Sequence, residues 1–309
     1  MSAPLIVRGN YADLYSSAAL PVLEEIFNHT LMLQPMIREQ LAAVKSTDRD
    51  IYQLTEMGDL QNFPEVPEGT DYSFVRPRAG LNQTMVIKKY GLGFSVSEEA
   101  VEDGKFEWIA DSVKKLAESA VETQEASVIN LFNNAFGTTL AWDGLSLCNT
   151  AHTLPSGLTF RNKASVDADL SPSALDNALQ DFQTQFIRDS GKIANIMPKV
   201  LLVPPALKRY AMEITGSDLR ADTTDNNMNS LKQDGLRVVV SPRLTSTLNW
   251  FLLADPSETG MRIITRKGIE TKAADPAVGF MNDSIIYKSR FREIVGATHA
   301  YGVWGSNAP

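Results

Sequence analysis

The chain has 309 residues, of which 43% are hydrophobic and 21% are charged, an ordinary globular balance that argues against a disordered chain. Its formal net charge of -8 argues against a protein that coats nucleic acid through a basic surface, because phosphate neutralisation needs clustered lysine and arginine. Cys148 is the only cysteine, which excludes an intrachain disulfide and a zinc site made of several cysteines.

Residues 1–48 predict an arm rather than a domain. The opening MSAPLIVRGNYADLYSS lacks the charged region and apolar core of a secretory signal, and no window of the chain reaches the ~18 continuous apolar residues of a membrane span. Short helical stretches, interrupted by Pro21 and Pro35, carry the apolar residues Leu20, Leu23, Ile26, Leu31, Leu33, Ile37 and Leu41. Alone, such a segment has little to pack against.

Residues 49–97 predict a long β-hairpin. IYQLTEM, DYSFVRP and QTMVIKKYGLGFSVS have extended character, and we place the turn at Gly80, Leu81 and Asn82. An isolated two-stranded ribbon is only marginally stable in water, so we expect it to find a further layer on another subunit. The alternative is an ordinary internal sheet.

Residues 106–136 predict one very long amphipathic helix, with no proline inside it. At 1.5 Å per residue it would extend roughly 45 Å, which suits a structural beam better than a catalytic scaffold. Its apolar residues recur mostly at spacings of three and four: Phe106, Ile109, Val113, Leu116, Ala120, Val128, Leu131, Phe132 and Ala135.

The second half of the chain predicts a mixed core. A helix begins after the cap Ser171, with Pro172 in its first turn and Leu175, Leu179, Phe182 and Phe186 on one face. The strand KVLLV stops at Pro204, and Pro205 starts a helix that Gly216 ends. Residues 217–235 form a polar loop, and LRVVVSPRL and NWFLLADP predict two short buried strands.

The segment DSIIYKSRFREIVG alternates with period two. One face holds Ile285, Tyr287, Phe291 and Val295, and the other holds Lys288, Arg290 and Arg292. This cationic row would contact DNA or, as we favour, pair with acidic residues of the long helix within or between subunits. The acidic residues that we name for it are Glu107, Asp111, Glu118, Glu122 and Glu125.

No motif predicts chemistry, so we expect no catalytic, cofactor or metal site. His29, His152 and His299 have no metal-binding spacing. Cys148 and His152 lie four apart, but no third group orients the histidine, and an intracellular hydrolase that uses Cys148 is a distant alternative. GLSLC at 144–148 lacks the second glycine of a nucleophile elbow, and GLG at 91–93 lacks the third glycine of a dinucleotide loop.

An ordered set of segments resembles the major capsid proteins of tailed bacteriophages, the Hong Kong 97-type shell subunit, and within them the branch of Mu-like head proteins. The segments cover most of residues 50–309: GLGFSVSEEAVEDG, LFNNAFGTTLAWDG, LCNTAHTLPSGLTFRNK, KVLLVPPALKRYA and VVVSPRLTSTLNWFLLADP. No single segment is a chemical fingerprint, so the specificity comes from their order and spacing.

The resemblance implies an α+β capsid fold with several parts. It implies an N-terminal arm at 1–48, an extended loop at 49–97, a peripheral domain at 98–165 with the spine helix at 106–136, and an axial domain at 166–255. Residues 256–290 would add the long strands of the peripheral domain, and residues 291–309 a return strand to the axial domain.

The resemblance also implies a function: a structural, non-enzymatic subunit that self-assembles through pentamers and hexamers into an icosahedral shell around double-stranded DNA. It would assemble in the bacterial cytoplasm and end in the virion, without a cofactor or sequence-specific DNA binding. Because the chain starts almost directly with the arm, we expect a separate scaffolding protein, besides the portal. The nearer alternative is an encapsulin-like nanocompartment shell of the same fold, which holds cargo enzyme.

Some relatives join a lysine of the extended loop to an asparagine of the peripheral domain, with help from a glutamate. In this chain the candidates for such a bond are Lys88 or Lys89 and Asn282. The segment IIYKSRF, however, supplies no acid where the assisting glutamate is expected. We therefore predict no autocatalytic cross-link.

Overall fold

A computed structural model describes residues 19–75, 79–97, 99, 106–217, 229–273 and 284–308. The fold is α+β, as predicted, and the chain divides into two compact units. Unit 1 contains residues 1–36, 87–125 and 265–293, and unit 2 contains residues 37–86, 126–264 and 294–309. Three elements run from one unit into the other: helix α4 (Phe106–Asn133), strand β10 (Met261–Ala273) and strand β11 (Ser284–Ala297).

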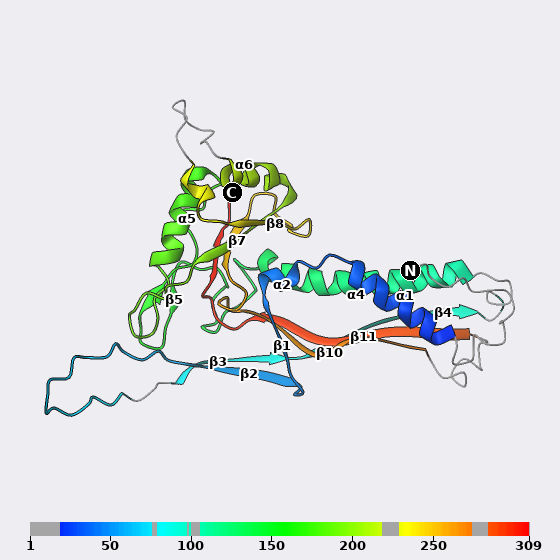
Figure 1. The fold of residues 1–309 in the computed structure, drawn as a ribbon, viewed down its shortest axis with the longest axis horizontal. Helices are drawn as coiled ribbons and strands as arrows, with labels where there is room; N and C mark the ends of the chain where they lie inside the picture. The colour runs from blue at the N-terminus through cyan, green and yellow to red at the C-terminus, as the bar shows by residue number, and fades with distance from the viewer. Residues whose placement is uncertain are drawn as a thin grey trace. The chain divides into compact units, whose positions relative to one another are not determined.

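In unit 1, helices pack on a sheet. Helix α1 (Ala19–Leu33) lies beside the first part of α4, and strand β4 (Lys88–Ser97) pairs with β11 (Figure 1). The apolar side chains between these elements are buried: Leu23, Phe27, Val96, Ile109, Val113, Leu116, Ala117 and Tyr287. Residues 1–48 have little to pack against alone, but in the fold Leu23 and Phe27 of α1 pack on the apolar face of α4.

The two prolines that were expected to interrupt the arm, Pro21 and Pro35, have different effects. Pro21 lies in the described part of α1, and the helix continues past it to Leu33. Pro35 follows the end of α1, and a short helix, α2 (Arg38–Leu41), comes next. The first 18 residues of the predicted arm lie outside the described residues.

Strands β4 and β11 pair antiparallel over ten residues, from Ser284 opposite Ser97 to Glu293 opposite Lys88. Two stacked ring pairs lie between them, Tyr90 with Phe291 at 5.0 Å and Phe94 with Tyr287 at 5.3 Å between centroids. Such cross-strand aromatic pairs stabilise a sheet and fix its register. The order of the whole sheet is β1-β10-β11-β4, with β1 at Ala43–Ser46.

The long helix is confirmed as α4, which ends at Asn133 instead of Phe136. Beyond it the backbone tightens into turns, because the N–H of Ala135 donates to the carbonyl of Phe132 and that of Gly137 to the carbonyl of Asn134. Phe132 and Ala135 are both fully buried, so the predicted apolar stripe continues beyond the end of the helix at Asn133.

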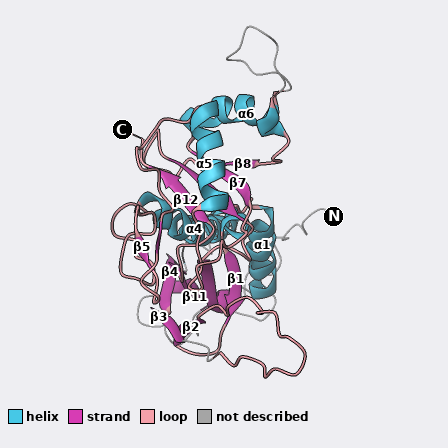
Figure 2. Ribbon diagram, turned by 90° about the vertical axis from the view of Figure 1, so that its left-hand side faces the viewer, coloured by secondary structure: helices cyan, strands magenta, loops and turns pink. Residues whose placement is uncertain are grey.

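Unit 2 is built on a sheet of order β12-β9-β7-β8. Its strands are β7 (Pro198–Val203), β8 (Arg237–Val240), β9 (Trp250–Ala254) and β12 (Val303–Ser306), and β7 and β8 run parallel. Helices α5 (Pro172–Thr184) and α6 (Lys208–Gly216) pack with this sheet in one hydrophobic core (Figure 2). Short elements complete it: β5 (His152–Thr153), β6 (Thr159–Phe160), and 3-10 turns at Pro205–Leu207 and Ser230–Lys232.

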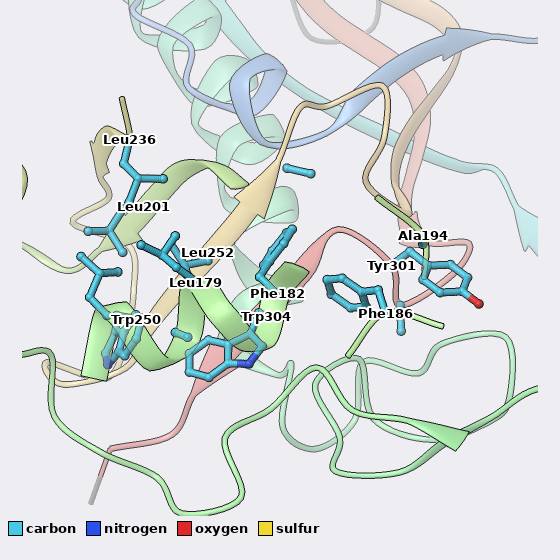
Figure 3. Packing of buried hydrophobic residues seen from close by; sticks show 14 of the residues in the cluster. Leu179, Phe182, Phe186, Ala194, Leu201, Leu236, Trp250, Leu252, Tyr301 and Trp304 are labelled. Atoms are coloured by element: carbon cyan, nitrogen blue, oxygen red, sulfur yellow. The ribbon is translucent and has the colours of Figure 1, made fainter. Parts of the chain in front are cut away.

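The predicted start of α5 is confirmed, since the side chain of Ser171 accepts a hydrogen bond from the N–H of Ala174 and Pro172 follows it. Phe182, on the predicted face of this helix, points into the core with Trp250, Leu252 and Trp304 of the sheet (Figure 3). Phe186, predicted for the same face, lies beyond the end of α5 at Thr184 but is buried in the same cluster. The strand-turn-helix at Pro204 is also confirmed, with a 3-10 turn before α6. Of the predicted polar loop at 217–235, residues 218–228 lie outside the described residues.

The predicted hairpin turn at Gly80, Leu81 and Asn82 is wrong. These residues lie inside β3 (Ala79–Val86), which pairs with β2 (Ile51–Met57), and Asn82 stands opposite Thr55. The connection begins after Met57 and includes residues 58–75, so DYSFV at 71–75 is loop rather than strand. The Gly-Leu-Asn sequence has turn-forming residues, but cross-strand pairing places it within the sheet.

Helix α4 is long, but no helix among the described residues is apolar over a length that would cross a membrane.

Candidate assembly surfaces

Among the described residues, the β2–β3 ribbon has no third strand. Its sheet contains only these two strands, so among the described residues the outer edges of β2 and β3 have no strand partner. One side of the ribbon packs inward, where Met85 is buried and its Sδ lies beside Gly296. The other side is exposed and includes the opposed pair Ile51 and Val86, each more than half exposed. A two-stranded ribbon with open edges and an apolar outer pair can be covered by another strand or another protein surface.

The loop at 58–75, between β2 and β3, exposes large apolar side chains. Phe63 is fully exposed, Phe74 is 96% exposed and Tyr72 is 74% exposed. Large aromatic side chains exposed in one loop are candidates for contact with a partner. The sequence hides these residues because DYSFV has the extended character of a strand; the signals for a loop are the prolines at 64 and 67 and the absence of alternation.

The start of this loop is anchored within unit 2. The hydroxyl of Ser190 donates to Oδ2 of Asp59 at 2.9 Å, and Nζ of Lys192 donates to the carbonyl of Leu60 at 2.6 Å. Nη1 of Arg188 lies 3.8 Å from Oδ1 of Asp59. These contacts hold the first residues of the loop, while every residue from 60 to 75 is exposed.

A cavity of ≈ 530 Å³ lies next to this anchor and is lined by aromatic side chains, among them Trp142, His299 and Tyr301. Burial, and then the charge of Arg262, lower the pKa of His299 to about 4, so its ring is neutral at pH 7. The described residues contain no group of three or more His, Cys, Asp and Glu side chains arranged to hold a metal ion.

The alternation predicted for DSIIYKSRFREIVG is confirmed in β11. Tyr287 and Phe291 are buried, whereas Lys288 is exposed and Arg290 and Arg292 are half-buried. The carboxylate of Glu270, on β10, lies 3.7 Å from Nη2 of Arg290 and also 2.8 Å from Nζ of Lys267. Arg290 therefore pairs with Glu270 of the neighbouring strand, which is not among the acidic residues predicted from the sequence.

Cys148 and His152 do not form a nucleophile and base. Nδ1 of His152 lies 2.7 Å from Oδ2 of Asp143, and its Nε2 faces the carbonyl of Leu147 at 3.2 Å and Oδ1 of Asn162 at 3.1 Å. The thiol of Cys148 is buried in an apolar cluster, and burial raises the pKa of Cys148 strongly. The structure thus provides the third group that the sequence did not reveal, Asp143, but the histidine does not serve the thiol.

The Asp143–His152 pair anchors a buried polar network. Burial raises the pKa of Asp143, but the hydrogen bond and charge of His152 and the N–H groups of Leu145 and Thr153 outweigh it, so that the pKa lies below its ordinary value. Asn162 donates to the carbonyls of Leu147 and Ala300, which ties residues 143–162 to the C-terminal segment. The network is structural because its polar groups satisfy one another.

The nominees for a cross-link are not brought together by any described contact. Lys88 and Lys89 are exposed on β4, and Asn282 lies outside the described residues. The acid nearest along β11 is Glu293, which is buried and accepts a hydrogen bond from Gln124 at 3.0 Å. The absence of a cross-link stays a prediction.

Solved capsid structures share this fold. The chain is similar to the capsid structure of cyanophage P-SCSP1u, with a TM-score of 0.58 and 10% identity over 89% of each chain. It is also similar to a structure from Mycobacterium phage Adephagia (TM-score 0.53, 15% identity, 99% of each chain). A virus-like particle from Pyrococcus furiosus gives a TM-score of 0.56 at 11% identity, over 94% of this chain and 100% of the other. These likenesses show the Hong Kong 97-type fold over most of the chain.

Comparison with curated proteins found no match. A model of the family described as phage capsid protein matches residues 82–305, from the middle of β3 to the last strand. The family is structural, which confirms the expectation that this chain is not an enzyme. The chain belongs to the phage capsid protein family: it is a major capsid protein of the Hong Kong 97-type fold that forms the icosahedral shell of a virion.

Proposed function

We propose that this capsid protein encloses the double-stranded DNA of a tailed phage by means of contacts that each copy leaves incomplete. The observation that carries the proposal is the β2–β3 ribbon, which has two open edges and ends in a loop with exposed Phe63 and Phe74. Neighbouring copies would cover these groups. Repeated contacts between two different patches generate rings when the rotation closes, and rings of five and six can share one shell.

We assign the parts of the shell subunit as the resemblance implies. The arm at 1–48 and the extended loop at 49–97 would reach neighbouring copies, residues 98–165 and 256–290 would form the peripheral domain, and residues 166–255 with the return strand at 291–309 the axial domain. Residues 291–309 supply β12 to the sheet of β7, β8 and β9. This pairing supports the assignment of the return strand to the axial domain. The polar loop at 217–235 would lie near the fivefold and quasi-sixfold axes.

The Mu-like branch and the two assembly partners also belong to the proposal. The branch rests on the ordered segments from GLGFSVSEEAVEDG to VVVSPRLTSTLNWFLLADP. A separate scaffolding protein would control curvature during assembly, and a portal would replace one ring of five. Expansion of the first shell would be a population shift between two packings of spine helix and ribbon.

Electron microscopy of the purified, concentrated protein tests this function. We expect closed, uniform shells, and shells that contain nuclease-resistant DNA when the protein is produced with its phage partners. A variant that replaces residues 61–74 with a short glycine-serine linker should fold but stay unassembled, because the exposed loop that neighbouring copies would contact is gone. A matched control carries a glycine-serine linker in place of residues 155–158, an exposed turn elsewhere in unit 2. This control should assemble. A wild-type protein that stays monomeric under every assembly condition, with or without scaffolding protein, would contradict the proposal.

The contents of the particles distinguish the nanocompartment alternative. Shells isolated from cells would then hold a cargo enzyme and no packaged DNA. The match to a phage capsid family over residues 82–305 favours the DNA-containing shell.

A further inference from the structure

We propose that the cavity beside residues 58–60 binds a small organic cation of the linear aliphatic diamine class. The cavity has a volume of ≈ 530 Å³, within the usual range of small-molecule sites, and all of its lining residues belong to unit 2. The inference goes beyond the proposed function, because a site within one unit is complete in a single subunit and needs no shell.

Three rings form a corner of the cavity wall. The buried side chains of Trp142 and Tyr301 stack with their ring centroids 5.5 Å apart. His299 stands at 72° to Trp142, with ring centroids 6.2 Å apart. Because the rings meet at an angle, a ligand in this corner contacts more than one of them. Aromatic rings attract organic cations, and the attraction is stronger where water is excluded.

The inner wall next to these rings is aliphatic. Leu154 and Ala194 are buried in the same core cluster as Trp142 and Tyr301, and Ile196 packs against that cluster. Methylene groups gain free energy when they leave water for such a surface. A cation with an aliphatic stem therefore fits this wall better than a bare ion does.

The charged side chains of the lining are mostly acidic. Asp59, Asp189 and Glu258 contribute three carboxylates and Arg188 contributes one guanidinium, which leaves a formal charge of -2. Glu258 is exposed, whereas Asp59 and Asp189 are half-buried. A charge of -2 beside an apolar wall suits a ligand with two ammonium groups joined by methylene groups.

The positive groups near the cavity leave two of these carboxylates available. Nη1 of Arg188 lies 3.8 Å from Oδ1 of Asp59, so this guanidinium is already paired. Asp189 accepts a hydrogen bond from the N–H of Ser156 at 2.7 Å, an uncharged donor that leaves the negative charge in place. Glu258 supplies the second available charge at the exposed side of the cavity.

Two further basic residues do not offset this charge. His299 is neutral at pH 7, because burial and the charge of Arg262 lower its pKa to about 4. Arg262 is not part of the lining, and its Nη1 donates to three backbone carbonyls, those of Pro256, Thr259 and Met261. The aromatic corner therefore carries no positive charge of its own at pH 7.

Other classes of ligand fit the cavity less well. An anion would be repelled by the excess of carboxylates. A bare metal ion would gain nothing from the apolar wall, and the described residues contain no group of three or more side chains arranged to hold one. A neutral apolar molecule would make no use of the acidic groups. A diamine uses both the wall and the charges.

Calorimetric titration of the unassembled subunit with putrescine tests the proposal. We expect saturable binding of one molecule per chain. Butanediol has the same aliphatic stem without the charges, and it should not displace putrescine. Mg²⁺ has the charge without the stem, and at equal ionic strength it should not displace putrescine either.

Substitutions in the aromatic corner test the contribution of the rings. Trp142→Leu removes the indole and should weaken putrescine binding about tenfold. Trp142→Phe keeps an aromatic ring at the same position and should bind within about threefold of the wild type. Equal binding by the wild type and a folded Trp142→Leu variant would overturn the role of the rings.

Substitutions of the available carboxylates decide the matter even if Trp142→Leu fails to fold. Asp189→Asn with Glu258→Gln removes two charges, and the asparagine keeps an oxygen to accept from Ser156. This variant should fold and bind putrescine about fivefold more weakly. The control pair, Asp169→Asn with Glu213→Gln, alters two exposed acids elsewhere in unit 2 and should change binding by less than about twofold.

Four other results would overturn the inference. They are an absence of saturable binding, displacement of putrescine by butanediol, displacement by Mg²⁺ at equal ionic strength, and equal weakening by the two pairs of acid substitutions. Assembled shells should bind putrescine as the free subunit does. Loss of binding on assembly would assign the cavity to a lysine or arginine side chain of a neighbouring copy, and would overturn the assignment to a free amine.

Discussion

His152 and Asp143 form a buried pair, with Nδ1 of the histidine 2.7 Å from Oδ2 of the aspartate and the two side chains 0% and 4% exposed. Nε2 of His152 faces two oxygen acceptors, the Leu147 carbonyl and Oδ1 of Asn162. The orientation of Asn162 is set by its other bonds, since its Nδ2 donates to two carbonyls and its Oδ1 accepts from the N–H of Asn149. A ring that donates from both nitrogens satisfies all of these partners.

Replacing Asp143 by Asn should destabilise the subunit in a pH-dependent way. The folded protein lowers the pKa of Asp143, so the ionised carboxylate contributes stability above its unfolded pKa of about 4, and this contribution is lost as the pH falls through the lower, folded pKa. Near pH 7 we expect a loss of about 3 kcal/mol in the free energy of unfolding, because the substitution breaks a buried pair.

Urea unfolding of the dissociated subunit from pH 7 to pH 3 measures this effect. The difference between wild type and Asp143→Asn should shrink below about pH 4. Asp111→Asn, which alters an exposed pair with Lys114 on α4, should cost less than about 1 kcal/mol at every pH. A difference that is constant across this range would show that the carboxylate charge is not involved.

Gly93→Ala should weaken the pairing of β4 with β11. A Cβ at this position would lie 2.6 Å from the carbonyl oxygen of Tyr287, closer than atoms can approach, so the backbone would have to shift. We expect a loss of about 1–3 kcal/mol. Gly91→Ala is the matched control, since its Cβ would meet the nearest atom at 3.4 Å, and it should cost less than about 1 kcal/mol. Equal thermal stability of both variants would contradict the close approach.

Ser171→Ala should remove the cap of α5 and cost about 1 kcal/mol. The side chain of Ser171 accepts from the N–H of Ala174, and that N–H would lose its partner. Ser173→Ala removes an exposed hydroxyl that lies 3.3 Å from Oγ of Ser171 but leaves the bond from Ala174 in place, and it should change the stability by less than about 0.5 kcal/mol. Chemical denaturation of the two variants decides between capping and a general effect of losing a hydroxyl in the first turn.

The thiol of Cys148 should resist alkylation in the native subunit. Burial raises its pKa, so the thiolate that reacts with iodoacetamide is scarce at pH 8 and also inaccessible. Mass spectrometry should find the thiol unmodified under native conditions and fully modified in urea. Rapid native labelling would show that the cluster around Cys148 opens, and loss of an activity on labelling would revive the hydrolase alternative.

Mature shells should dissolve into single chains. The segment IIYKSRF supplies no acid where the resemblance places the helper, so we expect one band near 34.0 kDa on a boiled denaturing gel. The matching observation by mass spectrometry is an unmodified intact mass. A ladder of covalent oligomers that survives boiling would prove the prediction wrong.

The sequence by itself determined the elements whose signals are local. Ser171 and Pro172 define the start of α5, Pro204 ends β7, and the three- and four-residue spacing from Phe106 onward defines α4, because capping, ring geometry and helical periodicity act within one or two turns of chain. The alternation in β11 likewise separated Tyr287 and Phe291 from Lys288 and Arg290. The order of segments along the chain also indicated the capsid family that residues 82–305 confirm.

Only the tertiary structure decided which distant groups meet. Gly80 lies in a strand because β2 pairs with Ala79 and Asn82 on either side of it. Phe27 is buried because α4 offers an apolar face, and Arg290 contacts Glu270 because β10 lies next to β11. Asp143 orients His152 through a fold of the loop that no sequence spacing encodes. Cross-strand pairing and burial depend on neighbours that are far apart in sequence, and their combined free energy outweighs the local turn preference of a sequence such as Gly-Leu-Asn.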